Sequence, residues 1–316
     1  VLFVVNHPNG LVDPLYVTTT NRRQNHFLVR AASFKKPFVK KILESLYLLP
    51  IYRMRDGVKQ LANNQEIFEK CHIILNKGET LMIFPEGTHD KKRTVRSLSK
   101  GFTRILFGAL ENHKNLEITV VPVGITYQHT SHFPAKVTVN YGAPIATRAL
   151  FETNPSAKSI LILKSAVSEQ LKKLSVHIPD DENYETVLQR LIDAQVDFTA
   201  IDNVNEMIKN NAFPPKKAPK KAPLKALRFL IILNTIIPFL LWKKTSKKID
   251  EIEFIDTFRF SLSLVLCGLF YGLQSWIVSL FFGSIVGFFY LSVSALLILM
   301  YVKLVPTNAK KYTDVL

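Results

Sequence analysis

The sequence predicts an α/β domain, a mixed β-sheet flanked by helices, followed by a carboxyl-terminal transmembrane helical hairpin. Over the first half of the chain, short β-branched or aromatic runs alternate with segments of helical periodicity, which is typical of βαβ-rich domains. Residues 260–302, in contrast, contain no charged residue at all. These two patterns divide the chain into a globular part and a membrane part.

The elements of the globular part follow from apolar spacing and from the residues that interrupt it. Runs rich in β-branched and aromatic residues predict strands at residues 1–5, 80–84, 117–126 and 136–141. Apolar residues at helical spacing predict helices over 33–50, 58–75, 102–110, 157–175 and 183–210. The first of these helices is rich in lysine. It is therefore either a surface helix packed on the sheet or a basic amphipathic helix at a bilayer surface.

The uncharged stretch is too long for one transmembrane helix. Its forty-three residues would extend roughly 65 Å, against about 30 Å for a hydrocarbon core. Two spans fit instead, at about 260–279 and 284–302. An earlier apolar segment, residues 229–242, is short for a span and is interrupted by Asn234 and Pro238. We expect that segment to be interfacial or re-entrant.

These patterns imply three consecutive regions. We expect the globular domain over residues 1–212, with its motif-bearing core in 1–145 and a helical extension over 146–212. A stiff linker rich in proline and lysine follows over 213–225, and the membrane region occupies 226–316.

The net charge of +16 is concentrated in one segment. Residues 209–248 carry eleven Lys or Arg and no Asp or Glu. A basic block beside an apolar segment, without a nucleic-acid-binding module, favours anionic lipid over nucleic acid as the partner. The two cysteines, Cys71 and Cys267, offer neither a disulfide framework nor metal-ligand spacing, so we expect no metal.

A histidine and an aspartate lie six residues apart just after the first predicted strand. In Asn6-His7-Pro8-Asn9-Gly10-Leu11-Val12-Asp13, the proline and glycine end the strand, so we expect both side chains on a loop at its carboxyl end. Open α/β sheets bind ligands at that edge. A carboxylate bonded to one imidazole nitrogen fixes the tautomer and leaves the other nitrogen able to take a proton. The pair is a candidate general base with its orienting acid.

Three further motifs follow this pair along the chain. They are Leu49-Pro50-Ile51-Tyr52-Arg53, Phe84-Pro85-Glu86-Gly87-Thr88 and Val121-Pro122-Val123-Gly124. Together with NHxxxxD at Asn6 to Asp13, they resemble the glycerolipid acyltransferase family over residues 1–145. The branch that uses glycerol-3-phosphate or dihydroxyacetone phosphate is the most similar. One departure is His89, where that family usually carries Arg. Because the chain opens on Val1 inside a strand, we also expect a fragment that lacks the family's amino-terminal helices.

The resemblance implies transfer of a fatty acyl group from a thioester to a hydroxyl group. The acceptor hydroxyl is itself the nucleophile, so the protein must supply a base, oxyanion stabilisation and positioning. His7 with Asp13 supplies the base. Backbone amides around residues 84–88 or 121–124 are candidates for the oxyanion. The acyl donor, acyl-CoA or acyl carrier protein, is a substrate, and no cofactor is expected.

The same resemblance implies an acceptor site with a bound phosphate. Arg53 suits bidentate phosphate binding, or alternatively forms a surface pair with Asp56. Glu86 and Gly87 line the acceptor site, and Lys100 is the expected further phosphate contact. The other basic residues that follow Phe84-Pro85-Glu86-Gly87-Thr88 are expected to form a solvated face. They are Lys91, Lys92, Arg93 and Arg96. Residues with a structural role at the site are Asn6, Pro85, Thr88 and Pro122.

We therefore predict a membrane-bound O-acyltransferase of phospholipid synthesis that acts on glycerol-3-phosphate or dihydroxyacetone phosphate. The alternatives are an acyltransferase for 1-acylglycerol-3-phosphate or another lysophospholipid, and a non-catalytic membrane adaptor that retains the fold. A serine hydrolase would need a G-x-S-x-G elbow and a nucleotide-binding protein a glycine-rich phosphate loop, and the sequence contains neither.

Basic residues flank the long apolar stretch on both sides. Arg259 precedes it and Lys303 follows it, with Lys310 and Lys311 shortly after. Two spans place both ends on one side of the membrane, and the positive-inside rule makes that side cytoplasmic. We expect an integral membrane protein with a cytoplasm-facing active site.

Overall fold

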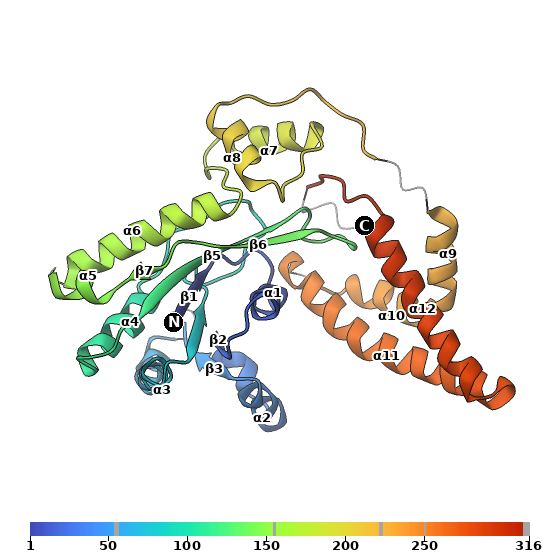
Figure 1. Cartoon of the computed structure of the whole chain (residues 1–316), viewed down its shortest axis with the longest axis horizontal. Helices are drawn as coiled ribbons and strands as arrows, with labels where there is room; N and C mark the ends of the chain where they lie inside the picture. Colours follow the sequence, from blue (N-terminus) through green and yellow to red (C-terminus); the bar gives the residue numbers. More distant parts are fainter. Residues whose placement is uncertain (54–56, 154–155, 221–223, 250, 312–316) are drawn as a thin grey trace.

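A seven-stranded sheet forms the centre of the globular part in the computed structural model, which describes residues 1–53, 57–153, 156–220, 224–249 and 251–311 (Figure 1). Six strands follow the order β3-β2-β4-β1-β5-β6, and β7 pairs with β5. The strands are β1 (Leu2–Val5), β2 (Asn25–Arg30), β3 (Leu48–Ile51), β4 (Thr80–Ile83), β5 (Thr119–Tyr127), β6 (Val137–Tyr141) and β7 (Ile145–Ala146).

Strand β1 lies in the interior of the parallel part of this sheet. It pairs in parallel with β4 on one side and β5 on the other, while β2 pairs in parallel with β3 and β4. Strands β6 and β7 run antiparallel to β5. The carboxyl ends of β1, β3 and β4 therefore meet at one edge of the sheet, where the loops that follow them can form a common site.

Strand β1 is buried on both faces, as a central parallel strand must be. Leu2 and Val4 pack into a large core with helices α3, α4 and α6, while Phe3 and Val5 pack into a second core with α1. Helices α1 (Val12–Thr20), α3 (Asn64–Asn76), α4 (Gly101–Asn112) and α6 (Ser156–Leu174) thus cover the two faces. This three-layer arrangement confirms the predicted mixed α/β class.

Asp13 lies in the first turn of α1, so the expectation that it is on a loop is wrong. The loop after β1 is only six residues long, and Val17 then anchors α1 against the sheet. An acidic residue in a first helical turn interacts favourably with the helix dipole. The helix fixes the carboxylate more firmly than a loop would.

The expected helix over residues 33–50 is shorter, and its last residues belong to a strand. Helix α2 covers only Pro37–Ser45, Tyr47 adopts a left-handed φ of 63°, and Leu48–Ile51 is β3. The β3 segment is at the sheet edge, where Pro50 is tolerated. No residue of α2 is buried and Phe38 is 75% exposed, so α2 does not pack on the sheet as a surface helix would.

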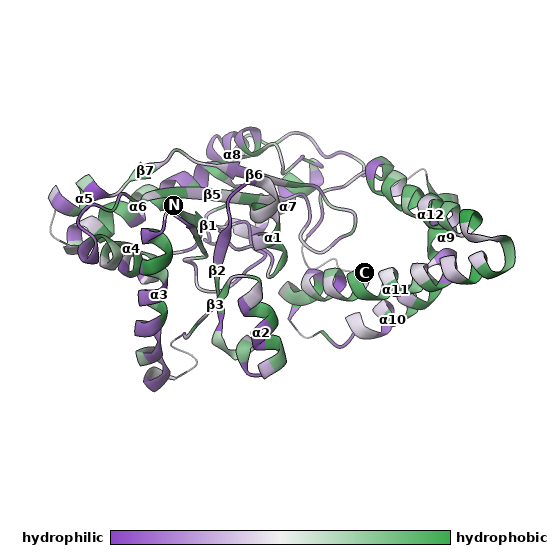
Figure 2. Cartoon of the chain, turned by 60° about the horizontal axis from the view of Figure 1, so that its bottom comes forward, coloured by the Kyte–Doolittle hydropathy of each residue, from purple (hydrophilic) through white to green (hydrophobic). Residues whose placement is uncertain are grey.

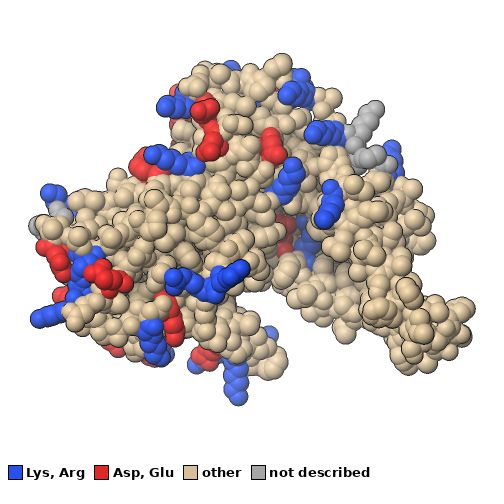
Figure 3. Space-filling view, viewed as in Figure 1, with Lys and Arg blue, Asp and Glu red and all other residues tan. Residues whose placement is uncertain are grey.

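Two long apolar helices form the carboxyl-terminal hairpin (Figure 2). Helices α11 (Ile255–Phe282) and α12 (Ser284–Leu304) are each long and apolar enough to cross a membrane, and they pack against each other. Gly283, with φ of 87°, makes the turn between them. Figure 3 shows no charged side chain over the far end of this hairpin.

The earlier apolar segment forms two helices that meet at a sharp bend. Helices α9 (Lys225–Asn234) and α10 (Ile236–Ser246) are bent by 92°, so they form either a broken third span or a re-entrant pair. Asn234 at the bend accepts a hydrogen bond from Tyr290 (2.5 Å) and donates one to Ser294 (3.0 Å), both of α12. Gln274 of α11 donates to the Asn234 carbonyl at 3.3 Å. These bonds satisfy polar groups that a broken helix exposes in an apolar environment.

A third small core joins the helical extension to the end of the chain. It contains α7 (Tyr184–Asp193), α8 (Ile201–Lys209) and buried Ala309, which follows α12. The backbone N–H of Lys220, in the linker, donates to the Asn308 side chain at 2.9 Å, and that side chain donates back to the Lys220 carbonyl. The chain after the hairpin therefore returns to the globular part.

Candidate active site

His7 and Asp13 form a hydrogen-bonded pair at the carboxyl end of β1. His7 Nδ1 lies 2.8 Å from Asp13 Oδ2, and the Asp13 side chain is fully buried while that of His7 is 14% exposed. Within the described part of the chain, His7 Nε2 makes no hydrogen bond. The pair thus has the arrangement of a base with its orienting carboxylate.

Two further donors hold the Asp13 carboxylate. The backbone N–H of Asn9 donates to Oδ2 at 2.6 Å, and the Tyr127 hydroxyl donates to Oδ1 at 2.6 Å. Burial raises the pKa of Tyr127 well above its usual value, and the charge of Asp13 adds to this effect. Tyr127 therefore remains a hydrogen-bond donor, and both carboxylate oxygens are occupied.

Two aromatic rings contact the imidazole of His7, and the Asn6 side chain holds the backbone next to it. The imidazole stacks on Phe84 with ring centres 4.2 Å apart, and His89 contacts it edge-on at 5.6 Å. The Asn6 side chain accepts from the N–H of Ile125 (2.7 Å) and donates to its carbonyl (3.0 Å), which ties the end of β1 to β5.

Glu86, whose side chain is buried, pairs with the partly exposed Arg96 in the loop after β4. Glu86 Oε2 accepts from Arg96 Nε at 3.0 Å and from Nη2 at 2.7 Å, and Arg96 also bonds the hydroxyl and carbonyl of Thr88. Burial raises the pKa of the Glu86 carboxyl group, while Arg96 opposes that shift. In the part of the chain that is described, Glu86 Oε1 is buried without a hydrogen bond.

Gly87 has φ of 77°, a left-handed conformation that favours glycine, and it makes the turn after Glu86. Pro85 accepts a hydrogen bond from the N–H of Ser99 at 2.8 Å. Pro122 lies inside β5, in register with Val4 of β1, where it takes part in the sheet.

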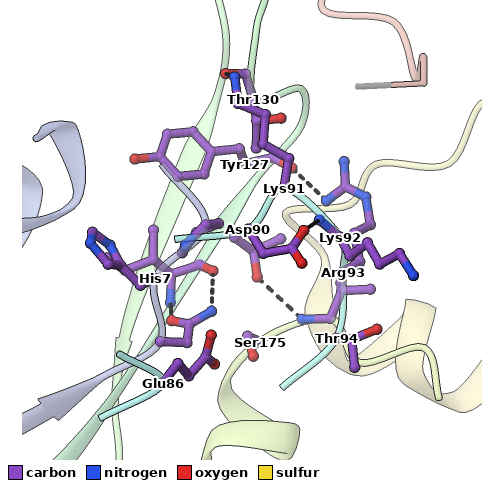
Figure 4. Close-up of a pocket in the computed structure, with 15 residues that line it drawn as sticks. His7, Glu86, Asp90, Lys91, Lys92, Arg93, Thr94, Tyr127, Thr130 and Ser175 are labelled. Carbon is purple, nitrogen blue, oxygen red and sulfur yellow. Dashed lines mark hydrogen bonds between the residues drawn. The ribbon is translucent and has the colours of Figure 1, made fainter. Parts of the chain in front are cut away.

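A small cavity lies behind the loop that carries His7 (Figure 4). Glu86 borders it at one end, and Arg93, Thr94 and Ser175 border it at the other. The imidazole of His7 points away from this cavity in Figure 4. The face of His7 that could meet a substrate is therefore on the opposite side of the loop.

The expectation of a solvated basic face after Glu86 is wrong for three of its four residues. The Lys91 side chain is fully buried and donates to Ser131 Oγ at 2.6 Å. The Arg93 guanidinium donates to the carbonyls of Tyr127 and Gln128 and lies 3.6 Å above the Phe198 ring. These contacts with β5 and the helical extension bury charges that local sequence presents as a hydrophilic run. Arg96, as described, binds Glu86.

The two expected phosphate ligands occupy other parts of the same sheet edge. Arg53 is half-buried just after β3, and Lys100 is exposed directly before α4. Strand β3 is separated from β1 by β2 and β4, a distance of roughly 14 Å at the usual strand spacing. Asp56, the alternative partner of Arg53, lies outside the described residues.

Sequence reasoning missed several residues that contact the His7–Asp13 pair. Asn9 contacts the pair through its backbone N–H, Phe84 from the position just after β4, and Tyr127 from the end of β5. Only Phe84 carried a signal, because it adjoins the Pro85-Glu86-Gly87 block. Among the described residues, no group of three or more His, Cys, Asp or Glu is placed to hold a metal ion.

Comparison with known proteins finds similarity over the first part of the chain. Residues 1–126 match the family model described as Acyltransferase. Glycerol-3-phosphate O-acyltransferase 2 of Saccharomyces cerevisiae is 23% identical over 152 residues, which are 47% of this chain and 19% of that protein. The 1-acyl-sn-glycerol-3-phosphate acyltransferase of Cocos nucifera is 31% identical over 109 residues, which are 32% of this chain and 33% of that protein.

A solved structure is also similar. The 1-acyl-sn-glycerophosphate acyltransferase of Thermotoga maritima shares 18% sequence identity at a TM-score of 0.38, over 57% of this chain and 68% of that one. The chain spans about a fifth of the length of the yeast relative. Residues 1–126 of this chain are thus similar to the Acyltransferase family.

Proposed function

We propose that this chain is a membrane-bound O-acyltransferase that moves a fatty acyl group from a thioester donor to glycerol-3-phosphate or dihydroxyacetone phosphate. The observation that carries the proposal is the His7–Asp13 pair. Its 2.8 Å contact occupies Nδ1 and leaves Nε2 to accept a proton. The acyltransferase-family match over the same residues supports this reading.

In the proposed reaction, His7 Nε2 takes the proton of the acceptor hydroxyl as its oxygen attacks the thioester carbonyl carbon. The tetrahedral intermediate collapses, the C–S bond breaks, and the imidazolium returns the proton to the leaving thiolate. Asp13 stabilises the imidazolium while Asn9 and Tyr127 hold the carboxylate. Backbone amides of residues 84–88 or 121–124 are the proposed oxyanion donors.

The acceptor phosphate is proposed to bind Arg53, with Lys100 as a second contact. Arg53 follows β3 and His7 follows β1, at the same edge of a parallel sheet. An extended arginine side chain and a phosphorylated glycerol together can cover much of the roughly 14 Å between these strands. Glu86 and Gly87, on the turn after β4, lie between them in strand order and are proposed to line the acceptor site.

The membrane is the proposed partner, with the active site on its cytoplasmic side. Helices α11 and α12 supply the spans, and residues 209–248 supply eleven basic residues for anionic lipid. The Lys220–Asn308 hydrogen bonds place the chain before α9 beside the chain after α12, which supports a re-entrant α9–α10 pair. Helix α2, with exposed Phe38 and neighbouring lysines, is proposed to rest on the same bilayer surface.

The second candidate acceptor is 1-acylglycerol-3-phosphate, which the name of the coconut relative suggests. The yeast relatives named for glycerol-3-phosphate match longer stretches of this chain, 47% and 43% against 32%, and we therefore rank that acceptor first. A non-catalytic adaptor is less consistent with a complete His7–Asp13 pair.

The decisive experiment is an acyl-transfer assay on the purified protein in lipid nanodiscs. Glycerol-3-phosphate, dihydroxyacetone phosphate and 1-acylglycerol-3-phosphate are compared, each with acyl-CoA and with acyl carrier protein. We expect thiol release and acylated product with one of the first two acceptors, and none in the His7→Ala variant. Absence of transfer to any acceptor with either donor would support the adaptor. Preference for 1-acylglycerol-3-phosphate would establish the second candidate.

A further inference from the structure

The start of the first membrane helix touches the loop that carries His7. Asp256 Oδ2 accepts a hydrogen bond from the Asn9 side-chain amide at 2.8 Å, and Thr257 Oγ1 accepts one from the N–H of Leu11 at 3.1 Å. Phe254, just before α11, contacts the His89 ring edge-on at 4.8 Å. Asn9 and Asp256 are separated by 247 residues in sequence, so the contacts arise from the tertiary fold.

Asn9 connects Asp256 to the proposed base. Its backbone N–H donates to Asp13 Oδ2 at 2.6 Å, and the same oxygen contacts His7 Nδ1. Asn9 is only 2% exposed, and its side-chain amide also donates to the Thr130 carbonyl at 3.3 Å. A displacement of Asn9 would therefore move the N–H group that orients the Asp13 carboxylate.

The Asp256 carboxylate is itself held in place by cations from two directions. Arg259 Nη1 donates to Oδ1 at 3.0 Å, and the buried Lys91 ammonium lies 3.8 Å from Oδ2. Lys91 and Arg259 also both bond Ser131, on the loop after β5. The carboxylate is thus a fixed acceptor whose position depends on α11, the loop after β5 and the loop after β4 together.

An acidic residue at this position has an ordinary explanation, because the first turn of a helix favours negative charge. That explanation requires no contact with Asn9 and no buried cation from another loop. Burying charged groups is costly unless each is paired and hydrogen-bonded, and here both cations contact the one carboxylate and also hydrogen-bond to Ser131. The pattern is that of a specific junction between the membrane helix and the loop.

We infer that Asp256 is a positioning residue for the base. Through Asn9 it holds the loop that sets the Asp13–His7 geometry, so that the membrane hairpin completes the active site in addition to attaching it to the bilayer. This inference rests on the proposed acyl transfer. Small displacements of a catalytic group can lower a rate about a hundredfold, so the contact has the potential to control turnover.

Kinetics of a double-mutant cycle in nanodiscs test the inference. Asp256→Ala and Asn9→Ala should each lower kcat by about tenfold, with the acceptor KM changed by less than about twofold. The double variant should be no slower than either single variant, because both remove the same contact. Asp256→Asn retains an acceptor oxygen for Asn9 and should stay within about threefold of the wild type. Glu169→Gln, which removes a surface ion pair on α6, is the matched control.

Hydrogen exchange provides a readout that does not depend on activity. In Asp256→Ala, the peptide covering residues 6–13 should exchange about tenfold faster, while the peptide covering α7 should be unchanged. Unchanged exchange in residues 6–13, kcat within twofold of wild type, or effects that multiply in the double variant would each overturn the inference. An inactive wild type would instead refute the proposed function, and the exchange result would still decide whether Asp256 orders the loop.

Discussion

The Tyr127 hydroxyl donates a 2.6 Å hydrogen bond to Asp13 Oδ1, the carboxylate oxygen that does not contact His7. Tyr127 is at the end of β5 and Asp13 is in the first turn of α1, so this hydrogen bond joins β5 to α1. The carboxylate is therefore held from the side opposite to the imidazole. Its orientation depends on the sheet as well as on the loop.

Removal of this hydroxyl should affect turnover more than substrate binding. A hydrogen bond to a charged group contributes about 1.5–3 kcal/mol, so we expect Tyr127→Phe to lower kcat by about tenfold or more. The acceptor KM should change little, because the Tyr127 hydroxyl bonds only Asp13 among the described residues. Steady-state kinetics check this, with Tyr16→Phe as control, since the Tyr16 ring packs 5.9 Å from that of Tyr127. A kcat equal to that of the control would show that Asp13 needs no second donor.

The His7–Asp13 pair gives the strongest kinetic prediction. General-base catalysis contributes about 10²–10⁴-fold, so His7→Ala should lose most of the turnover. Asp13→Asn should also act on kcat, because an amide no longer stabilises the imidazolium or fixes its tautomer. His113→Ala, at the opposite edge of the sheet after α4, serves as control. Near-normal kcat in both site variants would refute the assigned mechanism.

Arg53 is proposed to bind the phosphate group of the acceptor, so its replacement should weaken acceptor binding. Loss of a charge-assisted contact costs roughly 1.5–3 kcal/mol, so Arg53→Ala should raise the acceptor KM by about tenfold or more. Arg53→Lys should restore little of this, because an ammonium group lacks the planar fork of a guanidinium. Initial rates at varied acceptor and varied donor separate the two substrates. A raised donor KM with an unchanged acceptor KM would assign Arg53 to the donor site.

The proposed topology predicts the labelling of three single cysteines in a variant in which Cys71 and Cys267 are replaced by serine. Cysteines at Asn203, Lys247 and Asn308 should all resist an impermeant thiol reagent in intact cells and react once the membrane is opened. The contacts between Lys220 and Asn308 support this, because they hold the chain before α9 and after α12 together. Labelling at Asn203 alone would mean that α9–α10 crosses the membrane and makes a third span.

His129 should make the stability of the globular part depend on pH. Burial lowers the pKa of His129 to about 3 from its ordinary 6.5, with the neighbouring His132 adding to the shift. The unfolded chain therefore binds one more proton between these values, and stability falls as the pH falls through 6.5. The fall should be at most about 1.4 kcal/mol per pH unit.

Thermal unfolding at pH 7 and pH 5 measures this effect. His129 Nε2 lies 2.6 Å from the Lys311 carbonyl, so His129→Gln, which keeps an N–H donor, is the suitable comparison. We expect the wild type to lose more Tm than this variant between the two pH values. Equal losses would show that His129 is not the group that titrates.

Local features of the sequence predicted the parts of the site that depend on neighbouring residues. His7 and Asp13 are six residues apart, and the strands that precede His7 and Glu86, β1 and β4, are short buried runs, so spacing and composition were sufficient. Strand β2 was missed because Asn25-His26 begins it with polar residues. Residues 48–51 were assigned to a helix because Leu49 fits the helical spacing of the preceding residues, although β2 recruits them into the sheet.

The remainder of the site depends on contacts that local sequence does not encode. Tyr127 meets Asp13 across 114 residues, and Asp256 meets Asn9 across 247. The burial of Lys91 and Arg93 is likewise decided by the loop after β5 and by the helical extension. A hydrophilic run such as residues 90–96 has the same composition whether solvent or protein surrounds it.

The length of α11 bears on how far from the hydrocarbon the loop that carries His7 would lie. Its 28 residues extend about 42 Å, which exceeds a hydrocarbon core of about 30 Å by roughly 12 Å. If this excess is at the start of the helix, Asp256 and the attached loop lie at the depth of the lipid headgroups and glycerol backbones. A lipid product formed there would lie at the depth of the leaflet's own headgroups. It would enter that leaflet by lateral diffusion, without passing through water.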